Sequence, residues 1–322
     1  MKAIQVNHPG GPEALTPVEL PIPDPKPNEA LVKIHAAGVN FIDVYFREGR
    51  YPAALPFTVG QEAAGVVTAI GDGVTALKVG DRVAYTGVPG AYAEYAAVPE
   101  DRLVKIPDSL DFDQAAAAML QGMTAHYLTH STYPIKAGDD VLVHAAAGGV
   151  GSLLVQMAKL LGARVIATVG SEEKAKLAAE SGADEVIVYT TQDFEAETRR
   201  LTGDKGVNVV YDGVGKATFE KDLNVLKLRG YLVLYGGSSG AVPAFDAMTL
   251  NQKGSLYLTR PSLHHYIHTR QELEQRSNDV LGMIAAGKLK LRIHRTYPLT
   301  DAVLAHQDLE GRRTTGKLLL KP

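Results

Sequence analysis

The residues best suited to chemistry lie in a glycine-rich stretch between residues 140 and 159. A β-branched run from Val141 to Val143 leads into small residues and glycines, and an amphipathic helical pattern follows at once. Glycines let the backbone turn tightly and approach a ligand, while the first turn of a helix offers unpaired N–H groups and a partial positive charge. The stretch therefore predicts a site for a phosphate or pyrophosphate.

The spacing of the small residues suits a dinucleotide. Ala146 stands in the first glycine position of the G-x-G-x-x-G pattern, and Gly148 and Gly151 stand in the second and third. The pattern is a weak signal alone, and a turn that serves only packing is the alternative interpretation. We favour dinucleotide binding because a strand precedes the turn, a helix follows it, and further strand–helix units continue the pattern.

The end of the next predicted strand indicates which dinucleotide is bound. An NAD site has a carboxylate about 20 residues past the first glycine, but Val169 and Gly170 stand there in this chain. Ser171 and Lys174, at the start of the next helix, are able to hold a 2′-phosphate by hydroxyl and charge. The neighbouring Glu172–Glu173 pair weighs against this, and an ordinary solvated lysine is the alternative for Lys174. We predict that the cofactor is NADPH.

The rest of the chain supplies two kinds of structure. Residues 1 to about 110 alternate between apolar and polar with frequent turns, which predicts an antiparallel β domain. Asp113 is expected to cap a helix that ends near Met119, and a second helix is expected over 123–131. A βαβ rhythm follows and predicts a parallel sheet with helices on both faces. The expected strands are 141–144, 165–169, 185–189, 207–211 and 231–235, and the expected helices are 150–161, 172–180, 194–201 and 218–226. A long polar helix over about 269–286 and a strand near 317–320 are expected last.

Composition narrows the classes of partner. The formal charge of -3 gives no electrostatic reason to expect nucleic acid or a membrane surface as a partner. Cysteine is absent, so neither a disulfide nor a thiolate-bound zinc can form, which fits a reducing cytoplasm. The N-terminus lacks the apolar core of a signal peptide, and the longest apolar stretch is too interrupted to span a membrane. We predict a soluble, cytoplasmic protein.

Short motifs along the whole chain carry a family resemblance. They are Ala37–Asp43, Gly60–Gly65, Lys78–Val83, Gly90–Tyr95, Gly138–Lys159 and Asn251–Pro261. Taken together, the chain resembles the zinc-independent quinone oxidoreductases of the medium-chain dehydrogenase/reductase superfamily, the group that includes zeta-crystallin. The last motif is similar to that of the bacterial NADPH-dependent members.

The resemblance implies an α/β fold in which a Rossmann doubly wound parallel sheet is inserted into a mostly antiparallel β, GroES-like catalytic domain. The implied catalytic domain comprises residues 1–122 plus 263–322, and the implied NADPH-binding domain comprises residues 123–262. NADPH is expected in the cleft between the two domains. The family is typically dimeric, and the Asn251–Pro261 segment is the expected interface strand of a homodimer.

The resemblance also implies the site residues, position by position. Asn40, Tyr45 and Tyr51 are expected near the nicotinamide and the substrate. Lys174, Tyr189 and Ser238 or Ser239 are expected near the adenosine phosphate and ribose. The full implied set of cofactor-binding residues is Thr124, Ala147, Gly148, Gly149, Val150, Gly170, Ser171, Lys174, Tyr189, Gly213, Ser238 and Ser239.

The residues at two positions argue against a catalytic metal. Zinc-using relatives place a cysteine and a histidine where this chain has Asn40 and Gln61, and an amide is a poor zinc ligand. His264 and His268, four residues apart and beside His265, form an alternative metal site if they share one face of a helix. No glutamate completes a metalloprotease pattern there, so we predict no metal.

Without zinc to polarise an alcohol, reduction of an electron-poor acceptor is the easier chemistry. NADPH supplies the hydride and the protein supplies position, which suits quinones and also conjugated enones. Amide or hydroxyl donors from Asn40, Tyr45 or Tyr51 would stabilise charge on the acceptor oxygen, although each tyrosine has packing as its alternative role. We predict a quinone reductase. An enone or alkenal reductase, or a non-catalytic NADPH-binding protein, is the alternative.

Overall fold

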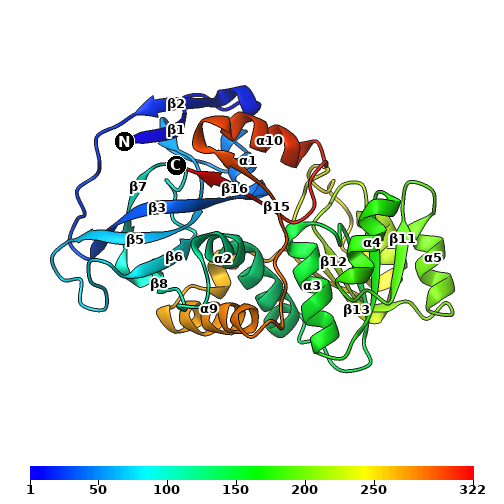
Figure 1. Cartoon of the computed structure of the whole chain (residues 1–322). Helices are drawn as coiled ribbons and strands as arrows, with labels where there is room; N and C mark the ends of the chain where they lie inside the picture. The colour runs from blue at the N-terminus through cyan, green and yellow to red at the C-terminus, as the bar shows by residue number, and fades with distance from the viewer. The chain divides into compact units, whose positions relative to one another are not determined.

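The structure is a computed structural model that describes residues 1–322. The chain divides into two compact units. Unit 1 comprises Met1–Met123 and Ile267–Pro322, and unit 2 comprises Thr124–Tyr266. In Figure 1, blue and cyan followed by orange and red mark the two segments of unit 1, and green to yellow marks unit 2. Unit 1 is therefore built from two stretches that unit 2 separates in the sequence.

Unit 1 contains two sheets, of three and seven strands, and antiparallel pairing predominates. The three-stranded sheet has the order β2-β1-β4, and the larger has the order β15-β16-β3-β5-β6-β8, with β7 also paired to β3. Only β15 and β16 pair in parallel. The predicted antiparallel β domain is confirmed. The strands are β1 (Lys2–Val6), β2 (Leu15–Glu19), β3 (Glu29–Val39), β4 (Phe57–Thr58), β5 (Glu62–Ile70), β6 (Arg82–Thr86), β7 (Tyr95–Pro99), β8 (Val104–Lys105), β15 (Ile293–Pro298) and β16 (Lys317–Lys321).

The helices of unit 1 differ from the expected ones at three places, one of which is a helix over 302–310 that was not expected. The helices are α1 (Phe41–Arg47), α2 (Phe112–Tyr127), α9 (Arg270–Ala285) and α10 (Ala302–Glu310). The two short helices expected near residues 113–131 form the single helix α2. This helix continues through Gly122, where the absence of a side chain lets Val280 of α9 pack closely. Helix α1 was not expected at all. The polar helix α9 is confirmed, and Thr269 and Glu272 cap its start reciprocally.

Unit 2 contains one six-stranded sheet in which every pair is parallel. Its order, β11-β10-β9-β12-β13-β14, is that of the doubly wound dinucleotide-binding fold, with the switch point between β9 and β12. The predicted fold class is confirmed. The strands are β9 (Asp140–Val143), β10 (Arg164–Val169), β11 (Glu185–Val188), β12 (Val207–Asp212), β13 (Leu226–Leu234) and β14 (Tyr257–Thr259), and the helices are α3 (Gly149–Leu160), α4 (Glu172–Glu180), α5 (Phe194–Leu201), α6 (Phe219–Asn224), α7 (Met248–Gln252) and α8 (Leu263–Tyr266).

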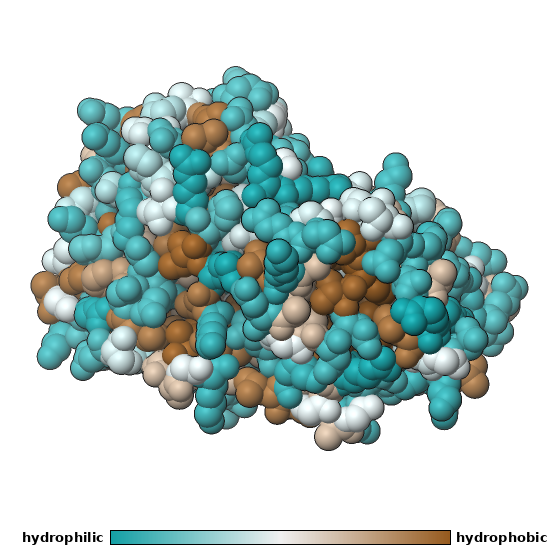
Figure 2. All heavy atoms as spheres, turned by 45° about the vertical axis from the view of Figure 1, so that its right-hand side comes forward, coloured by the Kyte–Doolittle hydropathy of each residue, from teal (hydrophilic) through white to brown (hydrophobic).

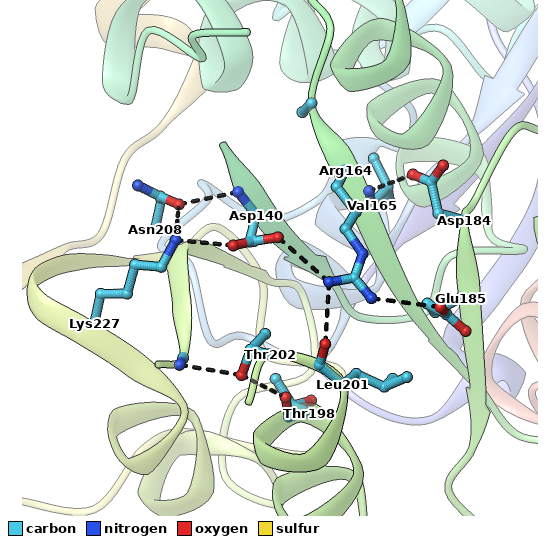
Figure 3. A network of polar contacts seen from close by, with 12 residues as sticks. Asp140, Arg164, Val165, Asp184, Glu185, Thr198, Leu201, Thr202, Asn208 and Lys227 are labelled. Atoms are coloured by element: carbon cyan, nitrogen blue, oxygen red, sulfur yellow. Dashed lines mark hydrogen bonds and ion pairs between the residues drawn. The ribbon is translucent and has the colours of Figure 1, made fainter. Parts of the chain in front are cut away.

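A polar network fixes the amino ends of these parallel strands (Figure 3). Asp140, at the start of β9, accepts a hydrogen bond of 2.8 Å from Lys227 of β13 and lies 3.7 Å from Arg164 of β10. Arg164 continues to Glu185 of β11 at 3.4 Å, and Asn208 of β12 accepts from the Asp140 N–H. The network holds five strands at one edge of the sheet, which leaves the opposite, carboxyl edge for loops that bind ligands.

On the face shown in Figure 2, clusters of hydrophobic groups lie between hydrophilic ones. No helix combines the length and the apolar character needed to cross a bilayer.

Candidate functional site

The glycine-rich turn has the strand–turn–helix geometry that the sequence predicts. Strand β9 ends at Val143, Ala145 adopts a left-handed φ of 50°, and the Gly148 N–H donates to the Ala145 carbonyl over 2.8 Å. A Cβ at Gly151 would lie 2.3 Å from that same carbonyl oxygen, so only glycine lets α3 begin there. Of the predicted phosphate contacts, Gly148 is the residue before α3, and Gly149 and Val150 begin it; their N–H groups have no acceptor within the helix. Ala147 is buried in the turn. This backbone fits a pyrophosphate.

The residues predicted for the 2′-phosphate come together at the end of β10. Ser171 caps α4 by accepting the Lys174 N–H over 3.3 Å. A Cβ at Gly170 would lie 2.7 Å from the Tyr189 hydroxyl, which shows that Tyr189 lies directly against this turn. The Ser171 hydroxyl and the Tyr189 phenol therefore lie at the turn where an NAD-specific site has its carboxylate, and Lys174 belongs to the first turn of α4 that follows.

The sheet order separates Ser238 and Ser239 from this turn, and their predicted position near the adenosine ribose stays a prediction. Both serines follow β13, which is three strands from β10, or roughly 14 Å at a strand spacing of about 4.8 Å. They contact the turn after β12 instead: the Ser238 N–H donates to Gly213, and the Ser239 hydroxyl donates to Val214 over 2.7 Å. Gly213 is thus grouped with the serines and away from Lys174. Thr124 is buried on α2.

Asn40 is completely engaged with protein groups in unit 1. Its Nδ2 donates to Glu62 Oε2 over 2.8 Å and to the Gly38 carbonyl over 3.2 Å. Its Oδ1 accepts from Lys317 Nζ over 2.7 Å, and Lys317 also forms an ion pair with Glu62. All three side chains are buried. Both amide hydrogens of Asn40 are thus engaged within unit 1, and its predicted donation to a substrate oxygen stays a prediction.

Tyr45 and Tyr51 lie together on and just after α1. Their rings meet edge to face with 5.6 Å between centroids, and Arg50 lies over the Tyr45 ring. Tyr45 is half-buried and Tyr51 is exposed. Two phenols at one surface of unit 1 are able to donate to an acceptor oxygen.

A series of buried hydrogen bonds fixes the position of α1. Asp43 Oδ2 accepts from the Asn40 N–H over 2.9 Å and from the Tyr92 hydroxyl over 3.0 Å. Tyr92 lies 3.2 Å from His306 Nε2, and Arg47 lies 2.9 Å from His306 Nδ1. Since Arg47 only donates, Nδ1 accepts and Nε2 carries the hydrogen. Burial and the Arg47 charge lower the pKa of His306 to about 3, so this ring stays neutral.

Comparison with known proteins agrees with these features. Residues 26–108 match the alcohol dehydrogenase GroES-like domain, and residues 149–275 match the zinc-binding dehydrogenase family. Quinone oxidoreductase 1 of Escherichia coli is 47% identical over 99% of both chains. The crystal structure of E. coli quinone oxidoreductase complexed with NADPH superposes with a TM-score of 0.98 at 46% identity, covering 100% of both chains. A 2-haloacrylate reductase of a Burkholderia species is 43% identical over 99% of this chain and 98% of its own.

The chain belongs to the quinone oxidoreductase family. The relatives include proteins named for a quinone acceptor and one named for a 2-haloacrylate acceptor.

This family member shows no arrangement for a metal at the histidines considered above. Helix α8 ends at Tyr266, before His268, so His264 and His268 do not share a helix face. The alternative of a metal site on one face of a helix was therefore wrong. No group of three or more histidine, aspartate or glutamate side chains is placed to hold a metal ion.

Sequence reasoning missed most residues that hold the site. Glu62, Lys317, Tyr92 and His306 lie far apart in the sequence and carry no joint pattern. Helix α1 had a usable signal, because Asn40 followed three residues later by Asp43 is a helix-start pattern. His144 also gave a usable signal, because it lies within an apolar run and a buried histidine needs partners.

Replacing Asp43 by asparagine should change the pH dependence of stability. Burial raises the pKa of Asp43 to about 7 from 3.8, only partly offset by its bonds to Asn40 and Tyr92. The folded chain therefore holds this proton more tightly, and its contribution to stability falls as pH rises from about 4 to 7. In urea unfolding, Asp43→Asn should gain about 3 kcal/mol relative to wild type between pH 5 and pH 8.

Asp72→Asn, at an exposed position of the same unit, is the matched control and should show a constant difference from wild type. A constant difference for Asp43→Asn as well would contradict the burial of a titrating carboxyl.

Proposed function

We propose that this protein reduces quinones with NADPH. The observation that carries the proposal is the end-to-end likeness to a quinone oxidoreductase solved with NADPH, in a chain whose own turn and sheet order suit a dinucleotide. NADPH supplies the hydride, and the protein supplies position and charge stabilisation.

Residues of unit 2 bind the cofactor in this proposal. The N–H groups of Gly149 and Val150 bind the pyrophosphate, and Ser171, Lys174 and Tyr189 bind the 2′-phosphate. Gly213 follows β12, and Ser238 and Ser239 follow β13, so these three residues belong to the other half of the carboxyl edge, away from the 2′-phosphate. Thr124 and Ala147 complete the proposed set. We further propose the functional division into a catalytic domain of residues 1–122 plus 263–322 and an NADPH-binding domain of residues 123–262.

Residues of unit 1 act on the acceptor. Tyr45 and Tyr51 donate hydroxyl hydrogens to an acceptor oxygen that gains negative charge. Asn40 contributes by holding the start of α1, since its amide is engaged with Glu62 and Lys317. Water delivers the proton in this mechanism.

Reduction of a conjugated double bond is the second candidate. The relative named 2-haloacrylate reductase favours it, because haloacrylates are conjugated acids and that protein matches nearly the whole chain. The same hydride donor and the same hydroxyl donors serve an enone or alkenal, so the shape of the acceptor site decides between the two candidates.

Homodimer formation and a cytoplasmic location are further parts of the proposal. Strand β14, within the Asn251–Pro261 segment, is an edge of the sheet, and Tyr257 on it is 51% exposed while stacking on Tyr231 at 4.4 Å. Leu228 nearby in the adjacent strand β13 is 78% exposed. An exposed apolar edge strand favours pairing with a second copy. A chain without cysteine suits the reducing cytoplasm.

An acceptor panel tests the activity. With NADPH in excess, 1,4-benzoquinone should be reduced with a higher kcat/KM than 1-octen-3-one or 2-chloroacrylate. Gly151→Ala should abolish turnover, because the new Cβ would lie 2.3 Å from the Ala145 carbonyl and deform the turn. Gly282→Ala, whose Cβ meets nothing within 4 Å, is the matched control. A higher kcat/KM for the enone would select the second candidate, and no turnover of any acceptor would refute both.

The choice of NADPH over NADH should depend on Lys174. A charge-assisted hydrogen bond contributes about 1.5–3 kcal/mol, so Lys174→Ala should lower the NADPH/NADH ratio of kcat/KM at least tenfold. Lys176→Ala removes an exposed lysine from the same helix and should leave the ratio unchanged. An unchanged ratio in Lys174→Ala means that another group recognises the 2′-phosphate.

Sedimentation velocity tests the dimer. The wild-type chain of 34.4 kDa should sediment at twice its mass at micromolar concentration, and Tyr257→Lys in β14 should sediment as a monomer because it places a charge on the exposed apolar edge. A wild-type monomer at all concentrations would contradict the proposed interface.

A further inference from the structure

His144 connects three strands at the carboxyl edge of unit 2. It directly follows β9 and is buried. Its N–H donates to the Tyr211 carbonyl of β12 over 3.1 Å, and two residues later the Ala146 N–H donates to the Thr168 carbonyl of β10 over 3.2 Å. The backbone that enters the glycine-rich turn is thus bonded to the strand on each side.

The imidazole side chain of His144 makes a second set of connections. Nδ1 lies 2.7 Å from the Thr168 hydroxyl, and Nε2 lies 2.7 Å from Asp222 Oδ1 on α6. The ring edge also packs on Phe194 of α5 at 4.8 Å. Because the carboxylate only accepts, Nε2 donates to it. Both ring nitrogens are therefore occupied, one by Thr168 within β10 and the other by Asp222 on α6, which follows β12.

Asp212 fixes the turn that leads from β12 to α6. Its two oxygens accept the N–H groups of Val214 and Gly215 and the Thr218 hydroxyl, the last over 2.8 Å. Asp212 and Asp222 are both buried. Burial raises the pKa of Asp222 to about 7, His144 lowers it and Asp212 raises it. The imidazole thus lies beside a pair of buried carboxyl groups at this edge.

These bonds span the switch point of the sheet, where β9 and β12 lie side by side and their following chains diverge. Doubly wound folds bind dinucleotides in the crevice formed there. We propose that His144 is a positioning residue for NADPH, which holds the glycine-rich turn, the Gly170–Lys174 turn and the turn after β12 at a fixed spacing. This inference rests on the proposed function. His144 does not contact the cofactor; it acts through Thr168 and Asp222.

Removal of one hydroxyl tests the inference with little disturbance. Thr168→Val keeps the volume but breaks the bond to Nδ1, so the Kd for NADPH and the KM for NADPH should rise about tenfold, with a much smaller fall in kcat. Thr168→Ser keeps the hydroxyl and should restore both constants to within about twofold. His144→Gln retains an amide that reaches Asp222 but cannot also reach Thr168, and it should raise the Kd by a similar factor. The double variant should raise it no further, because the two changes remove the same bond.

Thr198→Val is the matched control for packing. Thr198 is also buried in unit 2, its hydroxyl has no hydrogen-bond partner, and its carbonyl, the group that contacts Thr202 in Figure 3, remains. Thermal unfolding of each variant without NADPH identifies any general loss of structure, and Thr198→Val should bind NADPH as wild type does.

Three results would overturn the inference: wild-type Kd in folded Thr168→Val or His144→Gln, an equal loss of affinity in Thr168→Ser, or a loss confined to kcat. If Thr168→Val does not fold, His144→Gln and Thr168→Ser decide the matter. Failure of the wild-type protein itself to bind NADPH would refute the proposed function and this inference together. Normal wild-type binding with unaffected variants would refute the inference alone.

Discussion

The buried ion pair between Lys317 and Glu62 is the interaction on which unit 1 depends most. The two residues are 255 positions apart, and they belong to the two segments that unit 2 separates. A buried charge that loses its partner costs about 3–5 kcal/mol. The last strand must therefore return to β3 before either charge is satisfied. Gly38 leaves the room for this, since a Cβ there would lie 2.3 Å from Glu62 Oε2 and 2.7 Å from Lys317 Nζ.

Other contacts join the same two segments and explain why α1 has a fixed position. His306 of α10 lies against Tyr92, and Glu310 accepts from Arg47 over 2.6 Å. These bonds fix the first turn of α1 through Asp43 and its last turn through Arg47. Tyr45, between them, is placed by residues near the C-terminus that touch no substrate. A unit closed in this way accommodates an inserted domain without needing it for its own core, whose buried members come from both segments.

The parts that sequence could predict are those whose physics is local. Helix α5 and the ends of β9 to β12 follow from apolar periodicity and capping within about ten residues. The glycine-rich turn is likewise a backbone feature, encoded by small residues next to one another. Asn40 shows the limit: its motif was visible, but the partners that consume its amide are Glu62 and Lys317, and no local pattern connects them. Ser239 shows a related limit, because the strand order that separates it from Lys174 is a property of the whole sheet.

The charge balance around Asn40 also explains why this position holds an amide. Lys317 supplies one positive charge and Glu62 one negative charge, so the buried pair is already neutral. A carboxylate in place of Asn40 would add an unpaired buried charge, and an apolar side chain would leave donors of Lys317 and an acceptor of Glu62 without partners. An asparagine accepts from the lysine and donates to the glutamate at once. The residue that precedes α1 is therefore selected by hydrogen bonding within unit 1, and this fixed start positions the helix that carries Tyr45.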